Sequence, residues 1–426
     1  MKFVLANWGT RGEVEPYVTV GRELARRGHD VRMAVAPEML DFVESAGPAA
    51  VAYGPKLKAI LDPHRDFWTY LFSNPWKFQE LSRMWGEVSG PLTQHREEVS
   101  STLTSLTEGA DLLLTGMNYE DTAANVAEYR EIPLATLHIF PWRANGRLVP
   151  FLPSPLGRAA MRTFEWMSWR GSKEVEDAQR RELGLPKATS PSTRRIAERG
   201  SLEIQAYDEV CYPGLAAEWA KWNGQRPPKR PFVGALTMEL PTSTDDEVAS
   251  WIAAGTPPIC FGFGSVGVES AADTLAMISS VCATLGERAL ICAAGTDFSN
   301  MRDFDHVKVV GVMNYAAALP ACRAFVHHGG AGTTNAGLRA GLPAVILWTL
   351  PDQAAWGARV KRLKVGTGRR FSATTPESLL ADLRTALAPQ CLTRARELAA
   401  QMTRPAESVA AAADLIENFA HLNRVG

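Results

Sequence analysis

Apolar runs alternate with amphipathic segments along the first half of the chain. The run Lys2–Asn7 precedes a segment that places Pro16 in the first turn of a helix, carries its apolar residues on one helical face and stops at Gly28. Short apolar runs are typical of buried strands, and this spacing is typical of the helices that cover them. The pattern goes on to predict strands at 31–35, 111–115 and 133–138, helices at 37–46 and 118–129, and a charged, solvated helix at 175–183.

The second half of the chain repeats this alternation. Its apolar runs predict strands at 258–262, 288–293, 307–310, 324–326 and 343–348, with helices at 271–285 and before Gly341. Past residue 353 the pattern predicts a series of helices, one starting at 374–377 and an Ala-rich one at 405–422. Strands that alternate with helices predict an α/β fold built on doubly wound parallel sheets.

The length of the chain, 426 residues, favours two domains of about 200 residues each over a single one. The stretch 220–232 is rich in Pro, Gly and charge and is the predicted boundary. We therefore expect an N-terminal domain at 1–219, a linker at 220–232, a C-terminal domain at 233–404 and a final helix at 405–426.

Composition narrows the function classes. The net charge of −1 argues against a dedicated nucleic-acid binder. The six cysteines form no C-x-x-C pair, as expected of buried free thiols in a reducing compartment. The first residues turn polar too early for a signal peptide, and no apolar run approaches the ~20 residues that span a bilayer. These features predict a cytoplasmic protein with at most peripheral membrane contact.

Residues 324–334 hold the strongest chemical signal, an apolar run followed by His-His-Gly-Gly-Ala-Gly-Thr-Thr. Glycines let the backbone turn sharply and leave room for a ligand. A helix that begins at the threonines would offer unpaired N–H groups and a positive dipole end to an anion. Asp352 and Gln353 follow the next predicted strand, where open α/β sheets bind ligands and where sugar hydroxyls could be recognised. The alternative is a structural strand–turn–helix corner.

Residues 9–16 form the matching loop after the first strand. The loop contains Glu13, which either acts as a base within ~3 Å of a substrate proton or only favours the dipole of the following helix.

These segments resemble the family 1 glycosyltransferases of the GT-B fold, and most closely the actinobacterial enzymes that glycosylate vancomycin-type antibiotics and mycobacterial glycopeptidolipids. The signature His327-His328-Gly-Gly-Ala-Gly-Thr333-Thr is similar to the family's HHGxAGT, and Asp352-Gln353 to its DQ pair. The likeness runs from residue 1 to about residue 410. It implies two facing Rossmann-like domains, with a C-terminal helix that crosses back onto the first.

The resemblance assigns roles residue by residue. Glu13 stands where the antibiotic enzymes have an Asp that is proposed as the general base. This is a departure from the family pattern, because the side chain of Glu is one methylene longer than that of Asp. Val312 and Asn314 stand where many UDP-sugar enzymes have Trp and Pro, which favours a dTDP-linked 6-deoxysugar such as rhamnose. The implied donor-binding residues are Arg11, Gly12, Ser265, Val312, Asn314, His327, His328, Gly329, Gly330, Gly332, Thr333, Thr334, Asp352 and Gln353.

Aromatic residues in the first half of the chain predict an apolar cleft that binds the acceptor. The alternative is that these aromatic side chains pack a lid helix. The candidate acceptor residues are Trp68, Trp76, Trp85, Trp142 and His138, the last also a second candidate base.

Two motifs argue for other classes and are set aside. Gly262-x-Gly264-x-x-Gly267 fits a dinucleotide fingerprint, but its acid, Glu287, precedes the next strand and so cannot reach a ribose. Asp303-x-Asp305 spells a metal–nucleotide motif in a polar loop without carboxylate partners nearby in sequence. We expect no metal and no cofactor other than the nucleotide-sugar co-substrate.

The predicted function is an inverting glycosyltransferase that moves a sugar to a hydroxyl of a hydrophobic acceptor, such as a glycopeptidolipid or another secondary metabolite. Glu13 would take the acceptor's proton, while the helix start near Thr333 would receive the departing diphosphate. Three alternatives stay open: a UDP-glucose-dependent glucosyltransferase of sterol or polyketide type, a GT-B nucleotide-sugar 2-epimerase, and a non-catalytic nucleotide-sugar-binding protein.

Overall fold

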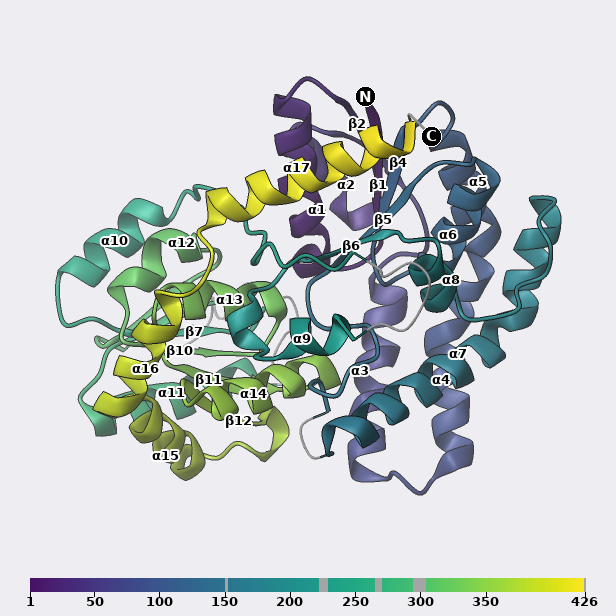
Figure 1. Cartoon of the computed structure of the whole chain (residues 1–426). Coiled ribbons are helices and arrows are strands. Elements are labelled where there is room, and N and C mark those ends of the chain that lie inside the picture. Colours follow the sequence, from purple (N-terminus) through teal and green to yellow (C-terminus); the bar gives the residue numbers. More distant parts are fainter. Residues whose placement is uncertain (150–151, 222–228, 265–269, 294–303, 425–426) are drawn as a thin grey trace. The chain divides into compact units, whose positions relative to one another are not determined.

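The chain divides into two compact units in a computed structural model that describes residues 1–149, 152–221, 229–264, 270–293 and 304–424. Unit 1 comprises Met1–Thr237 and Thr403–Gly426, and unit 2 comprises Met238–Met402 (Figure 1). Of the predicted linker 220–232, residues 222–228 lie outside the described residues. Lys229 and Phe232 form isolated bridges with Leu202 and Gln205 of unit 1.

Unit 1 is built on a six-stranded parallel sheet with the order β3-β2-β1-β4-β5-β6. Helices cover both of its faces, so β1, β4 and β5 are apolar runs that are almost wholly buried. The strands are β1 (Lys2–Asn7), β2 (Asp30–Val35), β3 (Ala49–Ala52), β4 (Leu112–Thr115), β5 (Leu134–His138) and β6 (Leu202–Gln205).

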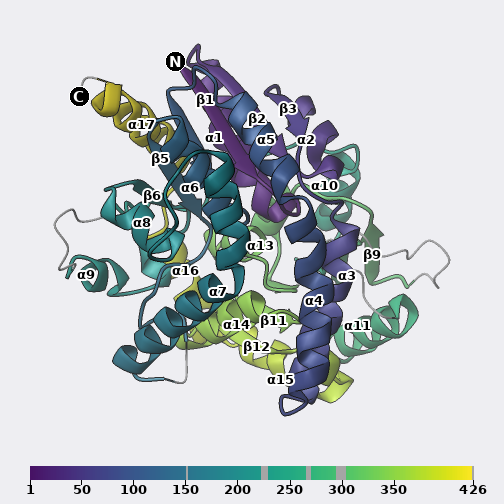
Figure 2. The same ribbon diagram turned by 90° about the vertical axis from the view of Figure 1, so that its right-hand side faces the viewer.

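The helices of unit 1 include a long pair, α3 and α4, that lie side by side (Figure 2). The helices are α1 (Arg11–Arg26), α2 (Leu40–Ser45), α3 (Lys58–Ser73), α4 (Phe78–Gln94), α5 (Arg96–Leu106), α6 (Glu120–Tyr129), α7 (Ser154–Glu182), α8 (Ser192–Glu198), α9 (Leu215–Trp219) and α17 (Pro405–Arg424), with 3-10 turns η1 (Pro37–Met39) and η2 (Glu209–Cys211). The last helix, α17, packs on α1 and β6, so the end of the chain belongs to unit 1.

Unit 2 repeats the same topology with the order β12-β11-β10-β7-β8-β9, all parallel. Its strands are β7 (Ile259–Gly262), β8 (Ala289–Cys292), β9 (Val307–Val310), β10 (Ala324–His327), β11 (Ala344–Trp348) and β12 (Gly366–Arg370). Its helices are α10 (Asp245–Ala253), α11 (Ala271–Leu285), α12 (Tyr315–Ala318), α13 (Ala331–Arg339), α14 (Pro351–Leu363), α15 (Pro376–Ala386) and α16 (Pro389–Ala399), with turns η3 (Leu319–Ala321) and η4 (Phe371–Ala373).

Three expectations about these elements were wrong. Helix α1 begins at Arg11, so Pro16 lies inside the helix rather than in its first turn. The charged segment 175–183 is the end of α7, where Glu176 and Arg180 are buried in ion pairs with Arg195 and Glu128. The region after residue 353 contains a strand, β12, besides its helices. All six cysteines are buried free thiols.

Candidate functional site

The strand order of each sheet reverses at one point, between β1 and β4 in unit 1 and between β7 and β10 in unit 2. Open α/β sheets bind ligands outside the carboxyl ends of the strands at such a point. Glu13 follows β1, and the His-Gly segment follows β10. Each unit therefore presents its candidate residues at its own switch point.

In unit 1, Glu13 is the third residue of α1 and closes its first turn. Its carboxylate oxygen Oε2 accepts the Thr10 backbone N–H at 2.8 Å, which is the reciprocal arrangement of a capping box. The other oxygen, Oε1, lies 3.4 Å from Nδ2 of Asn118, whose amide also donates to the Trp8 carbonyl at 2.8 Å. Sequence reasoning missed Asn118, although an amide just past a strand end is a usable signal.

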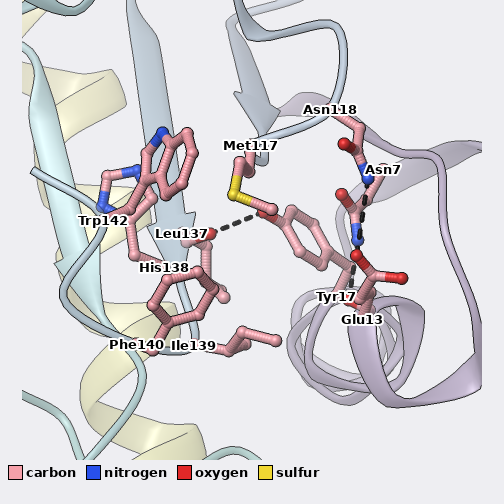
Figure 3. A pocket seen from close by; sticks show the side chains of 10 residues that line it. All are labelled: Asn7, Glu13, Tyr17, Met117, Asn118, Leu137, His138, Ile139, Phe140 and Trp142. Atoms are coloured by element: carbon pink, nitrogen blue, oxygen red, sulfur yellow. Dashed lines mark hydrogen bonds between the residues drawn. The ribbon is translucent and has the colours of Figure 1, made fainter. Parts of the chain in front are cut away.

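Glu13 lines a small cavity of about 30 Å³, enough for a water molecule or a hydroxyl group. Figure 3 shows Glu13 and Asn118 on one side of the cavity, with Phe140 and Trp142 on the other. Glu13 is the one carboxylate among the residues that line it: Asn7, Glu13, Tyr17, Met117, Asn118, Leu137, His138, Ile139, Phe140 and Trp142.

Tyr17 stands beside Glu13 in this cavity. Its hydroxyl lies 2.9 Å from the carbonyl oxygen of Thr115 and 2.8 Å from that of Leu137, so it ties together the ends of β4 and β5. Burial raises the pKa of Tyr17 well above its usual range. The hydroxyl therefore keeps its proton near neutral pH and serves to hold the cavity wall.

His138 is almost completely buried, and both of its ring nitrogens face polar groups. Nε2 lies 3.5 Å from a carboxylate oxygen of Glu120, and Nδ1 lies 3.4 Å from the amide nitrogen of Gln205. Burial, with the nearby Arg143 guanidinium, lowers the pKa of His138. In a neutral ring, Nε2–H then faces the Glu120 carboxylate, and the lone pair of Nδ1 faces the Gln205 amide.

A buried ion cluster supports this histidine. Arg143 makes a bidentate contact with Glu120, at 2.8 and 2.7 Å, and a further hydrogen bond with Glu203. Burial alone would raise the pKa of Glu120, but the attraction of Arg143 and the hydrogen bonds from His138 and Arg143 together outweigh it and lower the pKa to about 2. Glu120 and Glu203 are therefore charged near neutral pH, and the cluster fixes the loop that carries Trp142.

The structure brings only part of the predicted acceptor set to this cavity. His138 and Trp142 line it together with Glu13. Trp68 packs against the core beneath α3 and α4 and donates to His64, whereas Trp76 and Trp85 are 66% and 46% exposed and do not line the cavity.

In unit 2, the turn after β10 is shaped by Gly329, whose φ of 95° lies in the left-handed region. A Cβ at this position would also come within 2.7 Å of Ile346 and 3.1 Å of Gln353. The chain then enters α13, where the N–H of Thr334 donates to the Gly330 carbonyl at 2.8 Å. Within the described residues, the N–H groups of Gly332 and Thr333 have no such helix partner and stay available at the helix start.

The two histidines of this segment differ in their contacts. Nδ1 of His327 accepts the N–H of Gly329 at 3.1 Å, so a neutral ring carries its proton on Nε2. That buried Nε2 has no hydrogen-bond partner among the described residues. His328 lies over Gly264 and Gly330, where an added Cβ would come within 2.6 and 2.5 Å of its ring. Burial lowers the pKa of both histidines, so both are neutral near pH 7.

The Asp352-Gln353 pair opens α14 on the neighbouring strand connection. Oε1 of Gln353 accepts the N–H groups of Thr349 and Leu350 at 2.9 and 3.1 Å, which fixes the turn, whereas Asp352 is exposed in the first helical turn. Gln353 therefore fixes this turn and also lies against Gly329, while Asp352 is the exposed member of the pair.

The remaining predicted donor residues are spread over both units. Val312 is 50% exposed past β9, and the side chain of Asn314 caps α12 by accepting the Ala316 N–H at 3.1 Å. Arg11 and Gly12 are exposed in the first turn of α1. Ser265 lies outside the described residues.

The structure describes part of the two motifs that resemble a dinucleotide fingerprint and a metal–nucleotide motif. Glu287, the would-be ribose acid, pairs with Arg323. Asp303 lies outside the described residues. Among the described residues, no group of three or more His, Cys, Asp or Glu side chains could hold a metal ion. In the same part of the chain, no helix combines the length and apolarity needed to cross a bilayer.

Sequence relatives match the chain over its full length. It is 57% identical to an uncharacterized glycosyltransferase of Mycobacterium tuberculosis (strain H37Rv), with 100% of both chains covered. It is equally identical to one of Mycobacterium leprae, over 100% of this chain and 98% of the relative. A sterol 3-beta-glucosyltransferase of Arabidopsis thaliana is 26% identical, over 97% of this chain and 67% of the relative.

Solved structures share the fold at low identity. The glycosyltransferase of kitacinnamycin has a TM-score of 0.70 at 18% identity, with 98% of both chains covered. The spinosyn rhamnosyltransferase SpnG has a TM-score of 0.66 at 14% identity, over 98% of this chain and 99% of that one. The glycosyltransferase VinC, in complex with dTDP, has a TM-score of 0.62 at 17% identity over both full chains.

Family descriptions agree with these relatives. Residues 3–87 match the glycosyltransferase family 28 N-terminal domain, and residues 280–417 match the C-terminal domain of erythromycin biosynthesis protein CIII-like proteins. The chain is therefore a glycosyltransferase, and it belongs to the GT-B glycosyltransferases of the family 1 type.

Proposed function

We propose that this glycosyltransferase moves a 6-deoxyhexose such as rhamnose from a dTDP donor to a hydroxyl of a hydrophobic acceptor, with inversion and with Glu13 as general base. The observation that carries the proposal is the position of Glu13, the one carboxylate lining a hydroxyl-sized cavity opposite Phe140 and Trp142. Unit 1 would hold the acceptor and unit 2 the nucleotide sugar.

The proposed mechanism is a single displacement. Glu13 takes the proton of the acceptor hydroxyl, whose oxygen attacks the anomeric carbon opposite the departing diphosphate. The N–H groups of Gly332 and Thr333, together with the helix dipole, stabilise the charge that develops on the diphosphate. The unpartnered Nε2–H of His327 adds a neutral hydrogen-bond donor, and His328 is the neighbour that could share this task.

The general base is tested by Glu13→Gln. Gln keeps the capping box of α1, because an amide oxygen can still accept the Thr10 N–H, but it cannot take a proton. We expect kcat to fall by roughly 10²–10⁴-fold with the thermal midpoint nearly unchanged. A matched control is Glu15→Gln, two residues along the same helix, which should keep kcat. A Glu13→Gln enzyme with wild-type kcat would overturn the assignment.

The nucleotide is tested by thermal shift with dTDP, UDP, GDP and NAD. Selective binding stabilises the folded state by an amount that grows with ligand concentration over Kd. Two solved structures of this fold are complexes with thymidine diphosphate, and one neighbour is named a rhamnosyltransferase, so we expect the largest shift with dTDP. A preference for UDP would overturn the sugar assignment and favour the glucosyltransferase alternative, which the Arabidopsis relative supports.

A nucleotide-sugar 2-epimerase remains the alternative within this fold. It would consume the donor without any acceptor present. Product analysis of the wild-type enzyme with dTDP-rhamnose alone separates the two reactions, because the proposed transferase leaves the donor sugar unepimerised.

A further inference from the structure

The first half of α7 carries large apolar side chains that point into solvent. Leu156, Phe164, Trp166 and Met167 are 58%, 60%, 54% and 61% exposed. Successive helical residues are rotated by about 100°, so Leu156, Phe164 and Met167 fall on one face. Exposed apolar faces of this kind mark contact surfaces for proteins or membranes.

Positive charge flanks this face. Between Ser154 and Gly171 the helix carries three arginines and a single carboxylate, Glu165. Arg158 is paired with Glu218 at 2.8 Å, whereas Arg162 and Arg170 are exposed, the latter 5.7 Å from the ring of Trp166. Glu165 is half-buried, and burial raises its pKa.

The start of α4 offers a contrast within the same unit. Its first residue, Phe78, is 76% exposed, more than Phe164. Its neighbouring charges are balanced, because Arg83 pairs with both Glu80 and Glu87. Apolar exposure therefore occurs at both places, but an unbalanced positive flank occurs beside Phe164.

We propose that this face of α7 docks the enzyme on the surface of an anionic lipid bilayer. Leu156, Phe164 and Met167 enter the interface between headgroups and acyl chains, and Arg162 and Arg170 contact lipid phosphates. An amphipathic helix with aromatic residues on its apolar face and basic residues beside it binds membranes in this orientation. Charge complementarity is the reason to choose an anionic membrane over a second protein.

The test is flotation of the full-length protein with two kinds of vesicle. One is pure phosphatidylcholine and the other contains about 30 mol % phosphatidylglycerol, and two arginines favour the anionic vesicles by roughly tenfold or more. Salt near ~1 M should remove most of that preference, because it screens exposed charges. Equal binding to both vesicles, or binding to neither, would overturn the proposal.

Two variants and one matched control locate the contact. Phe164→Ser should weaken binding to anionic vesicles roughly tenfold, as should the double variant Arg162→Gln, Arg170→Gln. Phe78→Ser, which changes a more exposed aromatic outside this face, should bind as wild type. Equal loss in Phe78→Ser would indicate nonspecific adsorption and overturn the proposal.

Light scattering of the same variants tests whether a second copy of the chain, rather than a membrane, binds this face. A wild-type dimer that Phe164→Ser converts to a monomer, without any vesicle binding, would assign the face to a second copy of the chain and contradict membrane docking. Because the substituted residues are exposed, circular dichroism should confirm that each variant is folded.

Discussion

At the scale of single residues, His327 shows how burial sets chemistry. Its ring is completely buried, and burial lowers its pKa well below the usual value, with a smaller contribution from His328. The ring is therefore neutral at pH 7 and offers a ligand one N–H rather than a positive charge. A diphosphate bound there would find its positive field in the start of α13 instead.

This burial predicts a pH dependence of stability. The unfolded state binds a proton near the ordinary pKa of ~6.5 and the folded state does not, so stability falls as pH drops below that value. Between pH 7 and 5.5, His327 alone should account for a loss of about 1 kcal/mol. His327→Asn should show a correspondingly smaller loss in urea unfolding at the two pH values. An unchanged pH dependence would contradict the buried neutral state.

Asn118 and Glu13 illustrate a contact that chain spacing does not reveal. They are far apart in sequence but 3.4 Å apart in space, because β1 and β4 are neighbours in the sheet. Tyr119, the next residue, has a φ of 59°, an uncommon backbone conformation for a non-glycine residue. Such outliers cluster at functional sites, which adds weight to the proposed role of this corner.

At the scale of elements, helix α13 contains two glycines, Gly332 and Gly337, whose surroundings differ. A Cβ at Gly332 would meet no atom of the described residues within 4 Å, whereas a Cβ at Gly337 would come within 2.8 Å of Phe325. Glycine inside a helix costs stability relative to alanine. The described packing therefore does not require glycine at position 332. A diphosphate that approached the backbone closely would require glycine there.

Gly332→Ala should consequently raise stability by roughly 0.5–1 kcal/mol and weaken dTDP binding roughly tenfold. Gly337→Ala, in the same helix, should lower stability and leave dTDP affinity almost unchanged in the folded fraction. Calorimetric titration with dTDP, beside thermal unfolding, measures both quantities. A Gly332→Ala protein that binds dTDP as tightly as wild type would argue against a diphosphate at this helix start.

At the scale of the whole molecule, the chain leaves unit 1 after Thr237 and returns to it at Thr403. Helix α17 buries Ala412, Ala413, Ile416 and Ala420 in unit 1, and Arg27 pairs with its Glu417 at 2.6 Å. The fold of unit 1 therefore depends on the end of the chain, while unit 2 has its own core.

Ile416→Ala should destabilise unit 1 by about 2–5 kcal/mol, since it leaves a cavity under a fully buried side chain. The proposed nucleotide site is built from residues of unit 2, so dTDP binding should survive. Asp414→Ala is the control, because its partly exposed pair with Arg27 is worth about 1 kcal/mol or less. Calorimetry should show two unfolding transitions, and Ile416→Ala should shift only the transition of unit 1. A shift of both transitions would contradict independent cores.

The sequence by itself determined the alternation of strands and helices in each half of the chain, because a buried apolar strand and its covering helix leave a local periodic pattern; the strands β3, β6 and β12 were not predicted. The helix at 271–285 and the strand at 307–310 have the predicted bounds, and the His-Gly segment follows a buried strand as expected. Thr10-x-x-Glu13 is also a local cap signal, and it could have placed the start of α1 correctly.

Only the tertiary structure decided the features that depend on neighbours distant in sequence. Strand β12 carries Gly366 and Gly368 instead of apolar residues, and Gly368 is needed because Gly357 of α14 packs directly against it. The charged end of α7 is buried because α6 and α8 supply counter-ions. The polar groups that face the two ring nitrogens of His138, on Glu120 and Gln205, come from other elements of the fold. Burial and charge pairing are properties of the packed chain, and no local pattern encodes them.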